Sequence, residues 1–73
     1  MNSKDLANKI TLFFERYDML GGATVEEMYD ATYRALEGKD EEDIKIIKDY
    51  FKDIRWANKK AQEIFEELEV YFN

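Results

Sequence analysis

The sequence predicts an all-α fold, a small antiparallel helical bundle that forms a single domain over residues 1–73. Apolar residues recur at steps of three and four along most of the chain, which places them on one face of an α-helix. The chain contains no proline and only three glycines, so little interrupts helical hydrogen bonding. The glycines divide the periodicity into three segments, and we expect helices over about 3–20, 25–37 and 41–72.

The first expected helix covers 3–20. Asn2 or Ser3 can cap its start, and the carboxylate of Asp5 suits the positive end of the helix dipole. Gly21 is expected to end the helix in the left-handed conformation. The apolar face of this helix consists of Leu6, Ile10, Phe13, Tyr17 and Leu20. Leu12 and Met19 lie seven residues apart on a different face.

The second expected helix covers 25–37. Thr24 and Glu27 have the spacing of a capping box, in which each side chain accepts a hydrogen bond from the other residue's backbone N–H. Gly38 is expected to end the helix with a positive φ. The buried face should consist of Val25, Met28, Tyr29, Thr32 and Leu36.

The third segment, 41–72, begins after Asp40 with acidic residues that favour a helix N-terminus. It contains a long apolar series, which we call the seam: Ile44, Ile47, Phe51, Ile54, Asn58, Ala61, Phe65, Leu68 and Phe72. A continuous helix over this segment would be about 48 Å long, whereas the first two would be about 25 and 20 Å. The excess length requires either a second copy of the chain or a break near Asn58 that creates a fourth helix. We favour the unbroken helix because no proline or glycine lies near Asn58.

The composition excludes many kinds of active site. The chain has no histidine and no cysteine, which excludes zinc fingers, Ser-His and Cys-His nucleophiles, haem ligation and iron–sulfur clusters. We therefore expect a protein that is not an enzyme and that binds no cofactor or metal. No apolar run has the roughly 18 residues of a membrane span. With no cysteine and no apolar leader, a cytoplasmic location is expected.

A basic stripe is the first candidate binding site. Lys45, Lys48, Lys52, Arg55 and Lys59 follow helical steps along one edge of the third segment, and Trp56 lies beside them. The stripe is either a solvated helix face or a site for an acidic protein partner, since Trp and Arg are enriched in interface hot spots. A nucleic-acid interface is the alternative, although a net charge of −6 disfavours it. The expected partner-binding residues are Lys48, Lys52, Arg55, Trp56 and Lys59.

Acidic clusters are the second candidate. Carboxylates three or four residues apart on facing helices can bind Mg²⁺ or Mn²⁺. A chain with 17 acidic residues shows such spacing by chance, so a carboxylate metal enzyme is the weaker alternative. The clusters are Glu26, Glu27 and Asp30, and Glu63, Glu66, Glu67 and Glu69.

The main functional hypothesis is binding without catalysis, as a regulatory or inhibitory protein that contacts another protein. Self-association is also expected, because basic residues precede Asn58 and acidic residues follow it. An antiparallel homodimer would bring these opposite charges together. Asn58 itself either fixes the register of such a dimer or caps a helix break. The expected self-association residues are Asn58, Ala61, Phe65, Leu68 and Phe72.

Overall fold

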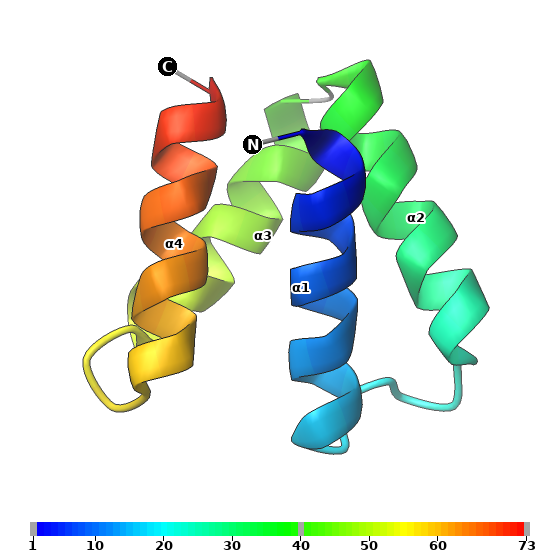
Figure 1. Cartoon of the computed structure of the whole chain (residues 1–73), viewed down its shortest axis with the longest axis horizontal. Helices are drawn as coiled ribbons and strands as arrows, with labels where there is room; N and C mark the ends of the chain where they lie inside the picture. Colours follow the sequence, from blue (N-terminus) through cyan, green and yellow to red (C-terminus); the bar gives the residue numbers. More distant parts are fainter. Residues whose placement is uncertain (1, 40, 73) are drawn as a thin grey trace.

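The part of the chain that the structure describes is a bundle of four α-helices of equal length. The computed structural model describes residues 2–39 and 41–72, and Figure 1 shows α1 (Ser3–Arg16), α2 (Val25–Gly38), α3 (Glu41–Ile54) and α4 (Lys59–Phe72). Each helix has 14 residues, which corresponds to about 21 Å. The expected mismatch in helix length therefore does not exist. Asp40, the expected start of the third segment, lies outside the described residues.

The helices follow one another around the bundle. α1 packs closely on α2, α3 packs closely on α4, and α4 returns to contact α1, while α2 and α3 make the smallest contact. In Figure 1, α1 lies between α2 and α4 with α3 behind. None of the helices in the described ranges has the length and apolar character that crossing a membrane requires.

The C-terminal segment breaks at residues 55–58. Asn58 lies before α4, and its Oδ1 accepts hydrogen bonds from the backbone N–H groups of Lys60 and Ala61 at 2.9 and 3.2 Å. The backbone N–H of Ala57 bonds to the carbonyl of Ile54 at 3.1 Å and closes α3. The continuous helix over 41–72 is therefore wrong, and the alternative of a fourth helix is confirmed. Asn58 makes the break possible without glycine or proline, because its side chain replaces the missing backbone acceptors.

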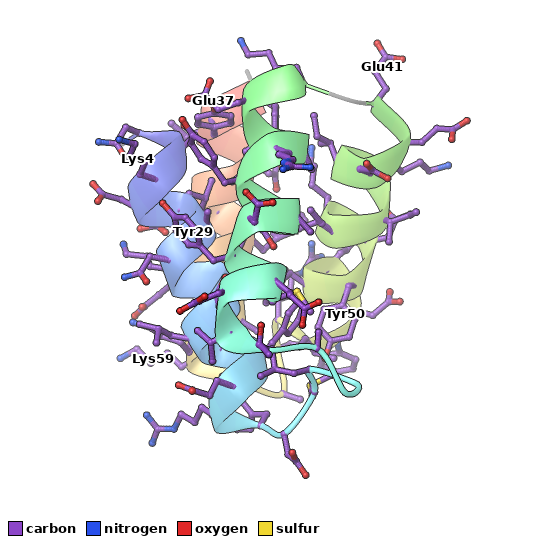
Figure 2. The ribbon with its side chains drawn as sticks, turned by 90° about the vertical axis from the view of Figure 1, so that its right-hand side faces the viewer. Lys4, Tyr29, Glu37, Glu41, Tyr50 and Lys59 are labelled. Carbon is purple, nitrogen blue, oxygen red and sulfur yellow. The ribbon has the colours of Figure 1, made fainter. Side chains whose placement is uncertain are left out.

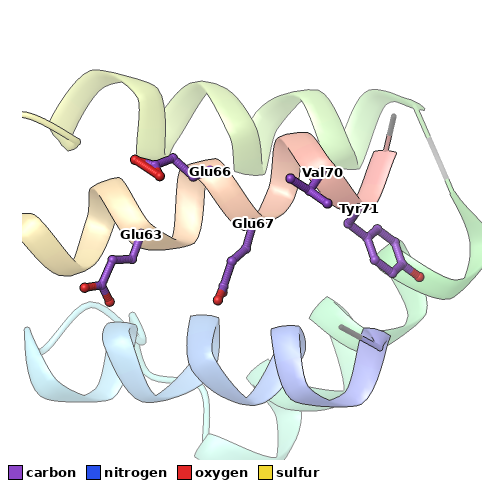
Figure 3. A pocket seen from close by; sticks show the side chains of 5 residues that line it. All are labelled: Glu63, Glu66, Glu67, Val70 and Tyr71. Carbon is purple, nitrogen blue, oxygen red and sulfur yellow. The ribbon is translucent and has the colours of Figure 1, made fainter.

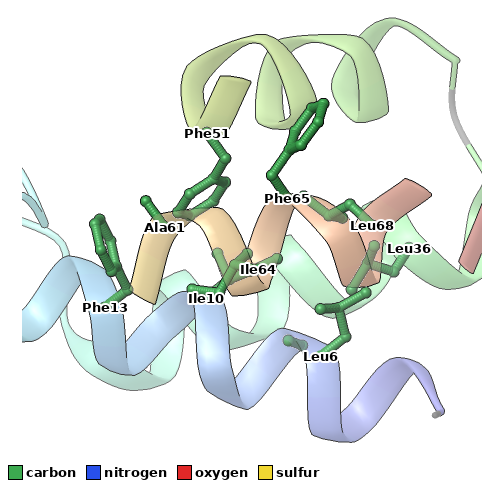
Figure 4. Close-up of a cluster of buried hydrophobic side chains, with 10 residues drawn as sticks. Leu6, Ile10, Phe13, Leu36, Phe51, Ala61, Ile64, Phe65 and Leu68 are labelled. Carbon is green, nitrogen blue, oxygen red and sulfur yellow. The ribbon is translucent and has the colours of Figure 1, made fainter. Parts of the chain in front are cut away.

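The seam folds back on itself and forms much of the core. Figure 4 shows Phe51 of α3 beside Ala61 of α4, and Phe65 and Leu68 of α4 belong to the same buried cluster. Ile47, Ile54 and Phe72 are partly buried against this cluster. Ile64 lies outside the seam pattern and is nevertheless fully buried. The other buried members come from α1 and α2: Leu6, Ala7, Ile10, Phe13 and Leu36.

Aromatic rings join the two hairpins. The ring of Phe51 lies 5.2 Å from that of Phe13 in an edge arrangement and 5.8 Å from that of Phe14 in a stacked one. Tyr50 contacts Phe14 edge-on at 5.4 Å. Such pairs each contribute about 0.5–1.5 kcal/mol beyond the area they bury. Phe51 is therefore the main link between α1 and α3.

α1 ends four residues earlier than predicted. Asp18 adopts a left-handed conformation with φ of 55°. Its N–H bonds to the carbonyl of Glu15 at 3.2 Å, and the N–H of Met19 bonds to that of Phe14 at 2.8 Å. This pair of bonds is a Schellman motif. Gly21 has a positive φ of 61°, but it lies in the following loop, so its predicted role as the helix cap is wrong.

α2 begins as predicted and ends one residue later. The hydroxyl of Thr24 accepts from the N–H of Glu27 at 3.1 Å, and the carboxylate of Glu27 accepts from the N–H of Thr24 at 2.9 Å, so the capping box is confirmed. Gly38 is the last helical residue, whereas Lys39 is left-handed with φ of 49°. The predicted left-handed Gly38 is therefore wrong.

Three side-chain bonds tie the helices together. Ser3 Oγ donates to Glu37 Oε1 at 2.6 Å, which joins α1 to α2. Lys9 Nζ contacts Glu67 Oε1 at 2.6 Å, which joins α1 to α4. The hydroxyl of Tyr71 donates to the carbonyl of Leu36 at 3.3 Å. The ion pair between α1 and α4 matters most for the groove between these two helices that is described below, because it spans them.

Candidate protein-interaction surface

Trp56 is the most exposed large apolar side chain of the described residues. It lies on the turn between α3 and α4 and is 85% exposed. Its indole Nε1 donates a hydrogen bond to the carbonyl of Asp53 at 3.2 Å. That carbonyl belongs to the last turn of α3, where backbone acceptors lack helical partners. The ring is therefore exposed and also held in one orientation.

Two cationic side chains accompany Trp56. Lys52 and Arg55 line the same shallow hollow, together with Asp53. The Arg55 guanidinium carbon lies 4.9 Å from the centroid of the Phe65 ring, a cation–π contact that restricts the side chain. We call Lys52, Arg55 and Trp56 the Trp56 surface.

The structure brings together only part of the predicted partner-binding set. Lys52, Arg55 and Trp56 lie together, as the helical spacing indicated. Lys48 is half-buried one turn earlier and does not line the hollow. Lys59 belongs to a different helix, α4, and lines a groove against α1. The predicted basic stripe is therefore divided by the turn at residues 55–58.

The groove that contains Lys59 was not predicted. It lies between the second half of α1 and the start of α4 and has a volume of about 630 Å³. We call it the α1–α4 groove. Its residues are Lys9, Leu12, Phe13, Arg16, Tyr17, Asn58, Lys59 and Lys60. The sequence signal was the off-face position of Leu12, which is 49% exposed. The groove itself depends on how α1 and α4 pack.

The start of α4 carries an unusual charge. α1, α2 and α3 each have acidic residues in their first turn, whereas α4 has none. Lys59 and Lys60 lie there instead, close to backbone N–H groups that are already positive. This arrangement is unfavourable by about 0.3–1 kcal/mol for each charge near the end of the helix dipole. Figure 2 shows Lys59 towards one end of the bundle, with Glu37 and Glu41 at the other.

The predicted self-association residues are already occupied within the monomer. Ala61, Phe65 and Leu68 are buried in the core. Asn58 caps α4, and Phe72 is half-buried. A second chain would reach the buried residues only if α4 left the bundle. Self-association through this set therefore stays a prediction, and it would require a rearranged chain.

The C-terminal acidic cluster lines a hollow on α4. Figure 3 shows Glu63 and Glu67 directed towards α1, with Glu66, Val70 and Tyr71 around the same hollow. Lys9 binds Glu67, Lys60 lies 3.6 Å from Glu63, and the side-chain amide of Gln62 donates to Glu66 at 3.2 Å. Glu67 Oε2 is buried and has no hydrogen-bond partner among the described residues. Most of these carboxylates are thus engaged with neighbouring side chains.

The acids of α2 have structural partners as well. Glu27 completes the capping box, and hydrogen bonds from the backbone and hydroxyl of Thr24 lower its pKa. Asp30 pairs with Arg34 at 3.0 Å. Within residues 2–39 and 41–72, no group of three or more acidic residues is arranged to hold a metal ion.

Comparisons with known protein families, characterised proteins and solved structures gave no match to this chain. Its function is therefore inferred from the surface of the molecule.

Proposed function

We propose that the protein acts by protein–protein contact, as a small regulatory or inhibitory module with no catalytic role, and that the Trp56 surface binds the partner. The supporting observation is the 85% exposure of a tryptophan that a hydrogen bond holds in place. When a partner covers a large apolar ring, each Å² removed from water contributes about 25 cal/mol to the binding free energy. An ordered ring also loses little conformational entropy on binding.

The neighbours of Trp56 define the partner chemistry. The partner should present an apolar pocket for the indole and carboxylates at its rim for Lys52 and Arg55. Arg55 already contacts Phe65, so it is ordered before the partner arrives. A nucleic-acid interface has less support, because the basic stripe is divided between two helices and the net charge is −6.

The chain contains one tryptophan and five tyrosines, so fluorescence excited selectively at tryptophan reports on this surface alone. In the free protein we expect solvent-like emission that iodide quenches strongly, since Lys52 and Arg55 attract the anion. A partner that covers Trp56 should shift the emission to shorter wavelength and protect it from quenching.

Capture from the native cell tests the surface directly. Baits of the wild type and of Val70→Ala should recover the same partner, because Val70 is also highly exposed, at 77%, but lies near the end of α4 and not on the turn that carries Trp56. Trp56→Ala should lose that partner while its helicity is unchanged. Equal recovery by the Trp56→Ala bait would contradict the proposal.

A further inference from the structure

The α1–α4 groove has the chemistry of a second binding site, separate from the Trp56 surface. Four of its residues are cationic, and no acidic residue lines it, although the whole chain carries a net charge of −6. Four of the eleven basic residues of the protein therefore gather at one hollow. They are Lys9, Arg16, Lys59 and Lys60.

The charges of the groove are only partly neutralised. Lys9 binds Glu67 and Lys60 lies near Glu63. Within the described parts of the chain, Arg16 and Lys59 form no ion pair. Lys59 also lies beside the positive end of the α4 dipole, so the unpaired charge is concentrated where α1 ends and α4 begins.

Apolar side chains lie among these charges. Leu12 is 49% exposed and Tyr17 is 44% exposed, and Phe13 lines the same hollow from the edge of the core. A volume of about 630 Å³ lies within the range of about 300–1,000 Å³ that small-ligand pockets occupy. A ligand that fits the α1–α4 groove must therefore carry an apolar group with negative charges on both sides of it.

We propose that the α1–α4 groove binds an acidic segment of a partner protein, with one apolar side chain between Leu12 and Tyr17 and flanking carboxylates near Arg16 and Lys59. This site does not depend on the Trp56 surface. A nucleic acid fits less well, because its phosphates form a long track whereas the cations here are confined to one hollow.

The probe for this site is a fluorescein-labelled synthetic peptide in which a single leucine lies between runs of glutamate and aspartate. Fluorescence anisotropy with the 73-residue chain should show peptide binding that weakens as salt rises. A matched peptide with serine in place of leucine should bind at least about tenfold more weakly, since about 1.4 kcal/mol of apolar contact corresponds to that factor.

Two charge variants test whether Lys59 and Arg16 bind the peptide. Lys59→Glu should weaken peptide binding at least about tenfold. Its melting temperature should stay close to that of the wild type, because the gain at the helix dipole and the new repulsion of Glu63 are of similar size. Arg16→Gln should weaken binding in the same direction and covers the case in which Lys59→Glu folds poorly. Trp56→Ala should bind the peptide as the wild type does.

Each contrary outcome overturns a defined part of the proposal. No peptide binding, or equal binding by the wild type and both charge variants, excludes the groove. A loss of binding in Trp56→Ala moves the peptide to the Trp56 surface. If a single-stranded oligonucleotide of equal charge binds more tightly than the peptide, the occupant of the groove is a nucleic acid and not a protein segment. Loss of the captured partner in Trp56→Ala together with intact peptide binding supports both sites separately.

Discussion

Asn58 Oδ1 accepts a hydrogen bond from the backbone N–H of Ala61 at 3.2 Å, and this bond starts α4 where the sequence pattern continues without a break. Asn58→Ala should therefore destabilise the protein by about 1 kcal/mol through loss of the cap. Urea unfolding followed by circular dichroism measures the change. The sign is decisive: in a continuous helix alanine would be the better residue, and stability would rise. Asn58→Asp keeps the acceptor and should retain the wild-type stability or exceed it.

Phe51 is fully buried and contacts aromatic rings of α1. Phe51→Ala should cost about 3–5 kcal/mol. A domain of this length has a total stability of roughly 4–11 kcal/mol, so the variant loses a large part of it and its melting temperature should fall steeply. Ile46→Ala on the same helix is the control, because Ile46 is 68% exposed. It should change stability by less than about 0.5 kcal/mol. Equal effects of the two variants would contradict the observed orientation of α3.

Gly38 and Lys39 each occupy a backbone conformation that suits the other residue better: Gly38 is helical and Lys39 is left-handed. Gly38 is helical, and a Cβ atom added there would meet nothing within 4 Å. Gly38→Ala should therefore stabilise the protein by about 0.5–1 kcal/mol. Lys39 is left-handed with φ of 49°, so Lys39→Gly should also stabilise it, by several tenths of a kcal/mol or more. Differential scanning calorimetry of both variants provides the test. A lower melting temperature for Gly38→Ala would mean that Gly38 is the left-handed residue.

Burial raises the pKa of Tyr50 above the ordinary tyrosine value of 10.0. The charge of Glu37 is the main cause of a raised pKa at Tyr33. A raised pKa means that the folded chain favours the neutral phenol. This stability is fully present below pH 10 and is lost as the pH rises through the folded-state pKa. Tyr50→Phe should reduce the loss of melting temperature above pH 10. An alkaline melting profile identical to that of the wild type would contradict the assignment to Tyr50.

The sequence predicted the helical class and the starts of α1 and α2 because these depend on local chemistry. Thr24 and Glu27 show the clearest case, since a capping box requires only two residues at the right spacing. Asn58 shows the limit. A polar residue in an apolar series has the same appearance whether it fixes a dimer or caps a helix, and only the packing of α4 against α1 decides between them. Asp18 is similar, because it closes α1 before the glycine that the pattern favoured.

The two candidate surfaces also differ in how far the sequence alone could predict them. Trp56 could be proposed as a partner-binding residue from its place beside the basic stripe in the sequence. The α1–α4 groove combines residues from opposite ends of the chain, such as Arg16 and Lys59. Helical periodicity describes one helix at a time and carries no information about which helices become neighbours.

The packing order of the helices has a kinetic consequence. Most contacts join helices that follow one another in the chain, and the contact between α1 and α4 is the long-range exception. Proteins dominated by such local contacts fold in microseconds to milliseconds. The ion pair between Lys9 and Glu67 spans nearly the whole sequence, so we expect it to form after the two hairpins have closed. The α1–α4 groove then exists only in a completely folded chain, and whatever occupies it stabilises the native state by mass action.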